Sequence, residues 1–425
     1  MYKDHSQLLI DVQKKSNINI TNVRDVKYLQ EEIESFTDLK IGFNTLRRLF
    51  GFLKQTKPST ATLNILANYL EYRSYTNYLS DRKKFEDWYF QQKILLIQLS
   101  NDITEEDMYT INKGINDRDN IVAIAYFITN LIDENKTILL HKIFSKLVLS
   151  KFEISNLLKF ATIITHSFYR ISETKALEIY NSLMKHESFR NTVPLLYIDY
   201  SNLNTIYSKV LGLVEVHSTK DSDLFFVLLM KFYKQFYTSD KLNFEKIKQP
   251  VNFSKFHLIL KGRYFAYKIM TSSSFGATLK KSIFIECKTN KAYIIIQEVI
   301  PALIIKGEYE ILSELSEKFY EDIFVSGKWY NNTTNAIYLI ALANISWSQN
   351  LLQVAKKNLA LIELDKIELS YYDYISLFYY HTQIKISYLD KDLKTNTLAH
   401  NALKKIVLKT GFIKFLSITK MYILN

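Results

Sequence analysis

Residues 349–364 read QNLLQVAKKNLALIEL, and their apolar side chains recur at the spacing of one face of an α-helix. Segments of this kind, roughly 12 to 18 residues long, follow one another beyond residue 80 and are separated by short polar turns. The expected helical segments are 155–169, 172–185, 222–236, 291–305, 309–323, 335–347, 351–362, 370–388 and 395–408. This succession indicates a long array of packed helix pairs.

The composition favours the same fold class. Among 425 residues there are only 9 glycines and 4 prolines, whereas 48% of the chain is hydrophobic. Sheet-rich folds use glycine and proline at their many turns, so a chain poor in both is expected to be helical. The sequence therefore predicts an all-α protein with a small domain at residues 1–80 and a helical array at 81–425.

The spacing within the array resembles that of tetratricopeptide repeats, in which helix pairs of roughly 34 to 40 residues stack on their neighbours. Residues 349–364, with Ala355 and Ala360, look like the second helix of such a repeat. TKALEIYNSLMK at 174–185 is similar. The resemblance implies an α-solenoid of antiparallel helix pairs that binds a peptide, a protein or a second copy of the chain. The number of repeats stays open.

The positive charge is concentrated near the N-terminus. The formal net charge is +12, and between Lys40 and Lys84 nine lysines and arginines stand against Glu71 and Asp81. An excess of this kind suggests an acidic partner, although composition alone does not separate nucleic acid from a membrane surface.

Residues 42–70, GFNTLRRLFGFLKQTKPSTATLNILANYL, lie within this basic region. We expect a helix at 26–36, a short helix from Asn44 to Phe50 ended by Gly51, and another helix from Thr60. In the short helix Leu46, Leu49 and Phe50 would face the core. The polar residues that would project outward from it are Asn44, Thr45, Arg47 and Arg48.

This pattern resembles the second half of a phage-repressor-like (Cro/C1-type) helix-turn-helix domain, and similar N-terminal regions occur in uncharacterised regulators of Bacteroidetes-type bacteria. The parts that match are the short helix ending in glycine, the Lys57-Pro58-Ser59 loop and the helix at 62–70. The resemblance covers roughly residues 5–80 and implies a DNA-binding domain. The expected base-reading residues are Asn44, Thr45, Arg47 and Arg48, because arginine bonds guanine and asparagine bonds adenine in the major groove. The expected phosphate ligands are Lys54, Lys57, Ser59 and Thr60.

Two functions remain open on the sequence. One is a bacterial DNA-binding transcription regulator, dimeric because one head covers a half-site, whose array binds a partner. The other is a protein-interaction scaffold whose N-terminal unit is a degenerate cap with a solvated basic face. In the array, Asn332, Asn335 and Asn344 are candidates for bonding a peptide backbone.

Signatures of an enzyme, a cofactor or a metal site do not occur in the sequence. There is no phosphate-binding loop, GxGxxG, GxSxG or HExxH, and the eight histidines show no i, i+4 pairs. The one cysteine, Cys287, has no nucleophile context and excludes an internal disulfide. No stretch predicts a signal peptide or a membrane span. We therefore expect a cytoplasmic, non-enzymatic protein.

Overall fold

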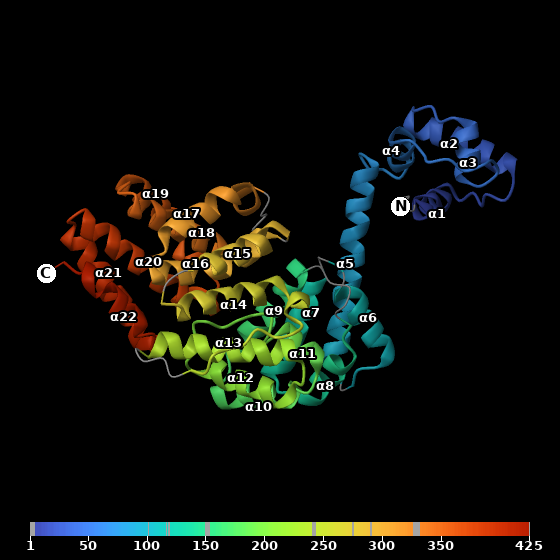
Figure 1. The fold of residues 1–425 in the computed structure, drawn as a ribbon. Coiled ribbons are helices and arrows are strands. Elements are labelled where there is room, and N and C mark those ends of the chain that lie inside the picture. The colour runs from blue at the N-terminus through green and yellow to red at the C-terminus, as the bar shows by residue number, and fades with distance from the viewer. Residues whose placement is uncertain are drawn as a thin grey trace. The chain divides into compact units, whose positions relative to one another are not determined.

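The computed structural model describes residues 5–100, 102–115, 117, 120–148, 154–239, 244–273, 276–289, 291–325 and 332–424, and every regular element in these ranges is helical (Figure 1). The all-α prediction is confirmed. The α-helices are α1 Ser6–Ser16, α2 Val23–Thr37, α3 Phe43–Leu49, α4 Thr60–Tyr69, α5 Tyr75–Leu99, α6 Glu105–Ile115, α7 Ile121–Asp133, α8 Thr137–Lys146, α9 Ile154–Phe168, α10 Glu173–Leu183, α11 Glu187–Thr192, α12 Ile206–His217, α13 Asp221–Thr238, α14 Leu258–Thr271, α15 Ala277–Thr289, α16 Ala292–Lys306, α17 Tyr309–Lys318, α18 Asn332–Ser348, α19 Leu352–Ala360, α20 Leu369–Leu389, α21 Leu393–Thr410 and α22 Lys414–Thr419.

The chain divides into two compact units, Met1–Ser100 and Asn101–Asn425. We call the described parts of these units the head (5–100) and the array (102–424). The division differs from the boundary expected at residue 80, because residues 75–99 form the single helix α5. Ser74 caps its first turn, and Tyr75 and Tyr78 belong to the core of the head. The charged run at 81–84 therefore lies inside a helix and is not a linker.

The core of the head is one cluster of apolar side chains from all five of its helices. The five helices and the turn between α2 and α3 contribute to it Leu8, Leu9, Val12, Val26, Leu29, Ile33, Ile41, Leu46, Leu49, Leu66, Ala67, Tyr69, Tyr75 and Tyr78. Two of its tyrosines bond carboxylates, since Tyr69 donates to Glu32 and Tyr78 donates to Asp11. The small unit thus satisfies the polar ends of its larger core residues.

In the second half of the array, long helices alternate with shorter ones. The helices α14, α16, α18 and α20 begin 34 to 40 residues apart, and each packs on the next. Each also packs on the helix that follows it in the chain. Ion pairs repeat with this period, because Lys280–Glu314 and Lys356–Asp390 each join residues 34 positions apart.

Four turns of the array share one geometry. In each turn one residue has a left-handed backbone, and the next helix begins two positions after it. The residue directly after the left-handed one donates its amide hydrogen to the carbonyl of the residue five positions before the donor. The left-handed residues are Asn135, Gly307, Asn350 and Lys391, and the donors are Lys136, Glu308, Leu351 and Asp392. This arrangement satisfies free carbonyls at the end of the first helix and sends the chain back along it. The same backbone geometry therefore joins consecutive helices at four places in the array.

Candidate nucleic-acid interface

The turn between α2 and α3 is held by two side chains of α2. The backbone amide of Ile41 donates to the Glu34 carboxylate at 3.1 Å, and the Ile41 carbonyl accepts from Gln30 Nε2 at 2.9 Å. Gln30 also donates to Glu34 at 3.0 Å. These bonds lower the pKa of the Glu34 carboxyl. The turn is therefore anchored at Ile41 in two ways, by the hydrogen bonds of its backbone and by the burial of its side chain. This anchoring sets the position of α3 relative to α2.

The start of α2 is fixed by a capping box. Asn22 Oδ1 accepts the amides of Arg24 and Asp25, and the Asp25 carboxylate accepts the amide of Asn22 in return. The backbone amides of Thr21 and Asn22 both donate to the Asp25 carboxylate and lower its pKa. The sequence interpretation had placed the start of this helix at Val26, whereas the structure begins it at Val23.

The short helix α3 presents two faces. Leu46 and Leu49 are buried, and Phe50 packs half-buried against the same core, as expected. Gly51 has φ +82°, a conformation that favours glycine, and ends the helix. The carbonyl of Arg47 then accepts the amides of Phe52 at 2.8 Å and Leu53 at 3.2 Å. Hydrogen bonds therefore hold the backbone on both sides of α3.

The four expected base-reading residues lie on the other face of α3, with different exposure. Asn44 is exposed, whereas Thr45, Arg47 and Arg48 are half-buried. Arg47 donates to Asn44 Oδ1 at 3.2 Å, and its guanidinium lies 5.6 Å from the ring centroid of Phe43. Arg47 Nε is buried without a partner among the described residues. The side chain of Arg48 has no hydrogen bond or ion pair with any described residue.

The four expected phosphate ligands are exposed and follow α3 directly. Lys54 and Lys57 lie in the loop between α3 and α4 and pair with no described carboxylate. Ser59 caps α4, where its hydroxyl accepts the amide of Thr62 at 3.1 Å. Thr60 is the first residue of that helix. The capping role of Ser59 was not predicted, although a serine before a helical pattern is its usual signal.

The electrostatics of this region follow from which charges are paired. Between Leu39 and Leu70 there are five cations and no acidic residue. The carboxylates of the head are mostly engaged with other groups: Glu34 with Ile41, Glu32 with Tyr69, Asp25 with the start of α2, and Glu71 with Lys15 at 2.6 Å. The basic residues around α3 therefore have no acidic residue among them in sequence. Of the four carboxylates, only Glu71 is paired with a cation among the described residues, and the hydrogen bonds to Glu34 and Asp25 stabilise their negative charge.

Two features of the array bear on catalysis, the thiol of Cys287 and a pair of histidines. Burial raises the pKa of the Cys287 thiol to about 12, which disfavours the nucleophilic thiolate. His141 and His186, which are far apart in sequence, hydrogen-bond at 2.8 Å. The described residues contain no group of three or more His, Cys, Asp or Glu side chains suited to a metal ion.

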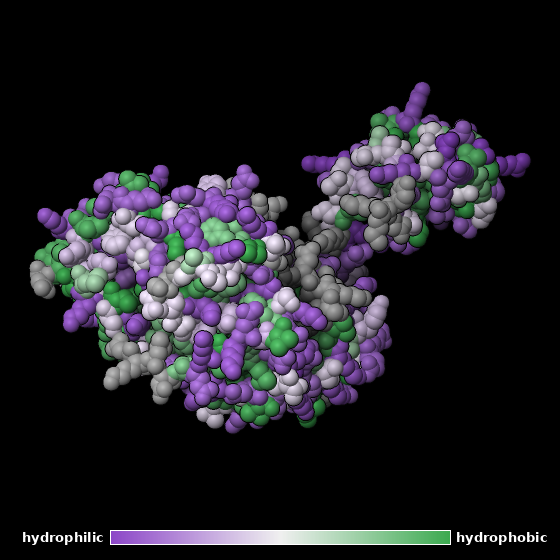
Figure 2. Space-filling view, viewed as in Figure 1, coloured by the Kyte–Doolittle hydropathy of each residue, from purple (hydrophilic) through white to green (hydrophobic). Residues whose placement is uncertain are grey.

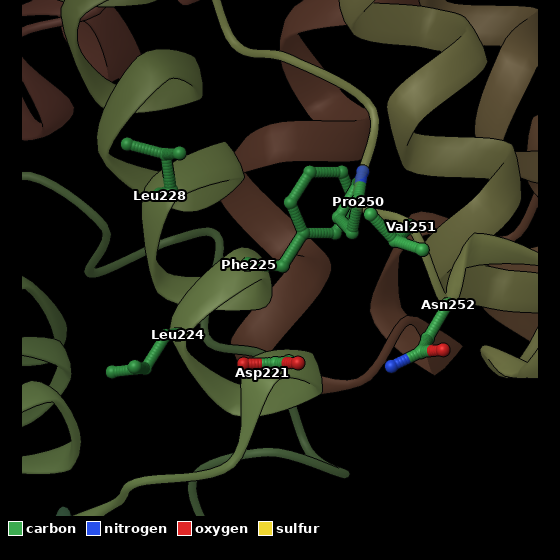
Figure 3. A pocket seen from close by; sticks show the side chains of 7 residues that line it. All are labelled: Asp221, Leu224, Phe225, Leu228, Pro250, Val251 and Asn252. Atoms are coloured by element: carbon green, nitrogen blue, oxygen red, sulfur yellow. The ribbon is translucent and has the colours of Figure 1, made fainter.

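A surface pocket with a volume of about 380 Å³ lies between α13 and residues 250–252 (Figure 3). The ring of Phe225 points toward Pro250, and Asp221 and Asn252 are the polar residues of the lining. One carboxylate and one amide beside apolar side chains form no acid–base pair or nucleophile. The visible face elsewhere is mostly hydrophilic, with hydrophobic residues in small separate patches (Figure 2).

Neither a membrane-spanning helix among the described residues nor a known relative indicates a function for this chain. Among the described helices, none combines the length and the apolar character needed to cross a bilayer. No family model matches the chain, and no curated protein and no solved structure matches it either.

Proposed function

We propose that the head binds DNA through α3 and the loop that follows it, and that the array binds a peptide, a protein or a second copy of the chain, so that the protein acts as a transcription regulator. The observation that carries the proposal is the charge distribution around α3. Arg48, Lys54 and Lys57 have no partner among the described residues, and no acidic residue interrupts the sequence that carries them.

The residues of α3 suit the major groove. Arginine can bond guanine through two N–H groups, and asparagine can bond adenine in the same manner. The bond from Arg47 to Asn44 orients both side chains before DNA arrives. Lys54 and Lys57 would neutralise phosphates, and the backbone amides at the start of α4 would add further donors. The rigid turn at Ile41 would keep these groups in register.

The array has the features of a tetratricopeptide-like α-solenoid of antiparallel helix pairs. The support is the spacing of its long helices and the turn that recurs before Thr137, Tyr309, Leu352 and Leu393. Stacked pairs of this kind build extended binding surfaces. Since one head covers only a half-site, tight and selective binding requires two heads, which we assign to a dimer.

The test is a shift assay of the full chain on fragmented genomic DNA at low and moderate salt. Arg47→Ala with Arg48→Ala should weaken selective binding by about 1–3 kcal/mol for each arginine that reads a base. The control is Lys404→Ala with Lys405→Ala, which removes two exposed charges from the array. Equal loss in both variants would show non-specific attraction. Unchanged binding in the arginine variant would refute the role of α3.

The scaffold alternative is favoured by one specific observation. Arg47 is bonded to Asn44 and lies over Phe43, so that part of α3 is already engaged within the head. A scaffold predicts no DNA binding by folded protein at either salt concentration and no change of partner binding in the arginine variant.

A further inference from the structure

The interior of the last helices is polar. Between α18, α20 and α21 the side chains of Asn344, Thr382, Lys385 and Asn396 have no exposed surface. Asn344 Nδ2 donates to Thr382 Oγ1 at 2.8 Å, and Lys385 Nζ donates to Asn344 Oδ1 at 2.7 Å. Most other packed helices of the array bury isoleucine, leucine and aromatic residues at such positions.

Among these four side chains, Lys385 is the one whose burial costs the most free energy. Its ammonium nitrogen donates to Tyr309 Oη at 2.6 Å and lies 3.7 Å from the ring centroid of Trp347. No carboxylate among the described residues pairs with it, and burial lowers its pKa to about 6. Burial that keeps an amine uncharged at neutral pH costs free energy relative to the unfolded chain, so an apolar residue of similar size would stabilise this core better. The polar interior therefore calls for a role other than stability.

The segment Lys420–Leu424 covers this interior, with a short 3-10 helix over Lys420–Tyr422 followed by the extended residue Ile423. Asn396 Nδ2 donates to the carbonyl of Tyr422 at 3.0 Å, and the amide of Leu424 donates to Asn396 Oδ1 at 3.0 Å. One side-chain amide thus holds the backbone on both sides of Ile423, which has extended angles. The ring of Tyr422 packs edge-on against Trp347 at 5.7 Å between centroids.

The covering segment is held more lightly than the helix before it. In α22 Phe415 is fully buried and its ring packs on Phe378. Beyond Thr419 the chain has exposed or half-buried side chains, and Met421 is 71% exposed. The segment could therefore leave while α22 stays in place.

We propose that the polar interior is a peptide-binding site that residues 420–424 occupy in the resting chain, and that an extended peptide with an aromatic residue and, two positions later, an aliphatic residue competes for it. Asn396 would bind the backbone of the incoming peptide, and Trp347, Tyr309 and Lys385 would form the pocket for its aromatic side chain. The inference rests on the proposed partner-binding role of the array, and it does not depend on DNA binding by the head.

The test uses a labelled peptide with the sequence of residues 418–424, ITKMYIL, and the full chain. Deletion of residues 420–425 should raise its affinity at least ~10-fold over the wild type, because the competing segment is gone. Tyr422→Ala in the full chain should open the site without truncation, and Met421→Ala, at an exposed position, should leave it closed. A peptide in which alanine replaces the tyrosine should bind weakly to every variant.

The results that would support the proposed peptide site differ from those that would overturn it. Binding that appears in the deletion and Tyr422→Ala variants, and is lost again when Asn396→Ala is added to either, would support the site. If both opened variants keep the wild-type unfolding transition of the array and still do not bind, the proposal is overturned. Equal binding of the alanine-substituted peptide would also overturn it. If the deleted chain does not fold, the Tyr422→Ala protein decides the result alone. DNA binding is measured separately, so failure here leaves the role of α3 intact.

Discussion

In the head, Arg48, Lys54 and Lys57 have no partner among the described residues, whereas in the array Arg263 and Lys261 are buried against Glu298 and Glu286. The difference in surroundings decides what each charge can do. A solvated cation carries no desolvation penalty and can bind an anion from another molecule, but it adds little to the stability of the fold. A buried pair is committed to the fold, because losing either partner leaves the other without solvent.

The largest effect is expected where the array buries its charges. Arg263 Nε donates to Glu298 Oε2 at 3.0 Å, and both side chains are almost fully buried. Glu298→Gln should lower the free energy of unfolding of the array by about 3–5 kcal/mol, because the guanidinium would lose its counter-charge. Urea unfolding followed by circular dichroism would measure this loss.

The matched control is Glu314→Gln, which makes the same change at an exposed pair with Lys280. It should cost less than about 1 kcal/mol. Similar losses in the two variants would show that burial does not distinguish these ion pairs.

A second effect concerns pH and the buried amine of Lys385. Its pKa is about 6 in the folded chain and near 10.5 when solvated, so the folded state binds fewer protons between these values. The stability of the array should therefore fall as the pH drops from about 10.5 to about 6, by up to about 1.4 kcal/mol per pH unit. Lys385→Met should remove most of this slope. Thermal unfolding at pH 7 and pH 9 would compare the two proteins.

Between pH 7 and pH 9 the neighbours of Lys385 add little to this slope, because the ordinary pKa of His381 is 6.5 and that of Tyr309 and Tyr422 is 10.0. Burial lowers the pKa of His381 to about 3 and raises the pKa of Tyr309 and Tyr422 above their ordinary value. The difference between wild type and Lys385→Met therefore isolates the amine. An identical pH slope in both proteins would show that Lys385 is solvated and charged in the folded chain.

Local patterns allowed much of the fold to be predicted, since helical periodicity depends on neighbouring residues. The segment expected at 335–347 is α18 at 332–348, and the one expected at 370–388 is α20 at 369–389. The boundary at residue 80 was wrong because α5 continues through it, and a charged run at 81–84 is compatible with a helix interior.

The site could be predicted only in part, for a related reason. The residue types on α3 and in its loop, and their spacing, are local features that the sequence shows directly. The partial burial of Thr45, Arg47 and Arg48 depends on packing within the head and differs from the outward projection expected for them. The bonds from Gln30 and Glu34 to Ile41, and the clasp of Asn396 on Tyr422 and Leu424, join positions that only the fold brings together. Asn344, a sequence candidate for bonding a peptide backbone, has no exposed surface and accepts a hydrogen bond from Lys385.

The smallest expected change in stability tests the free charges of the head. Lys54 is exposed and unpaired among the described residues, so Lys54→Ala should change the free energy of unfolding by no more than about 0.5 kcal/mol. If Lys54 neutralises a phosphate, the slope of log affinity against log salt should become shallower by about 0.9. Lys404→Ala in the array should leave that slope unchanged. A stable Lys54→Ala protein with an unchanged slope would mean that this loop does not contact DNA, and a destabilised one would mean that the charge serves the fold.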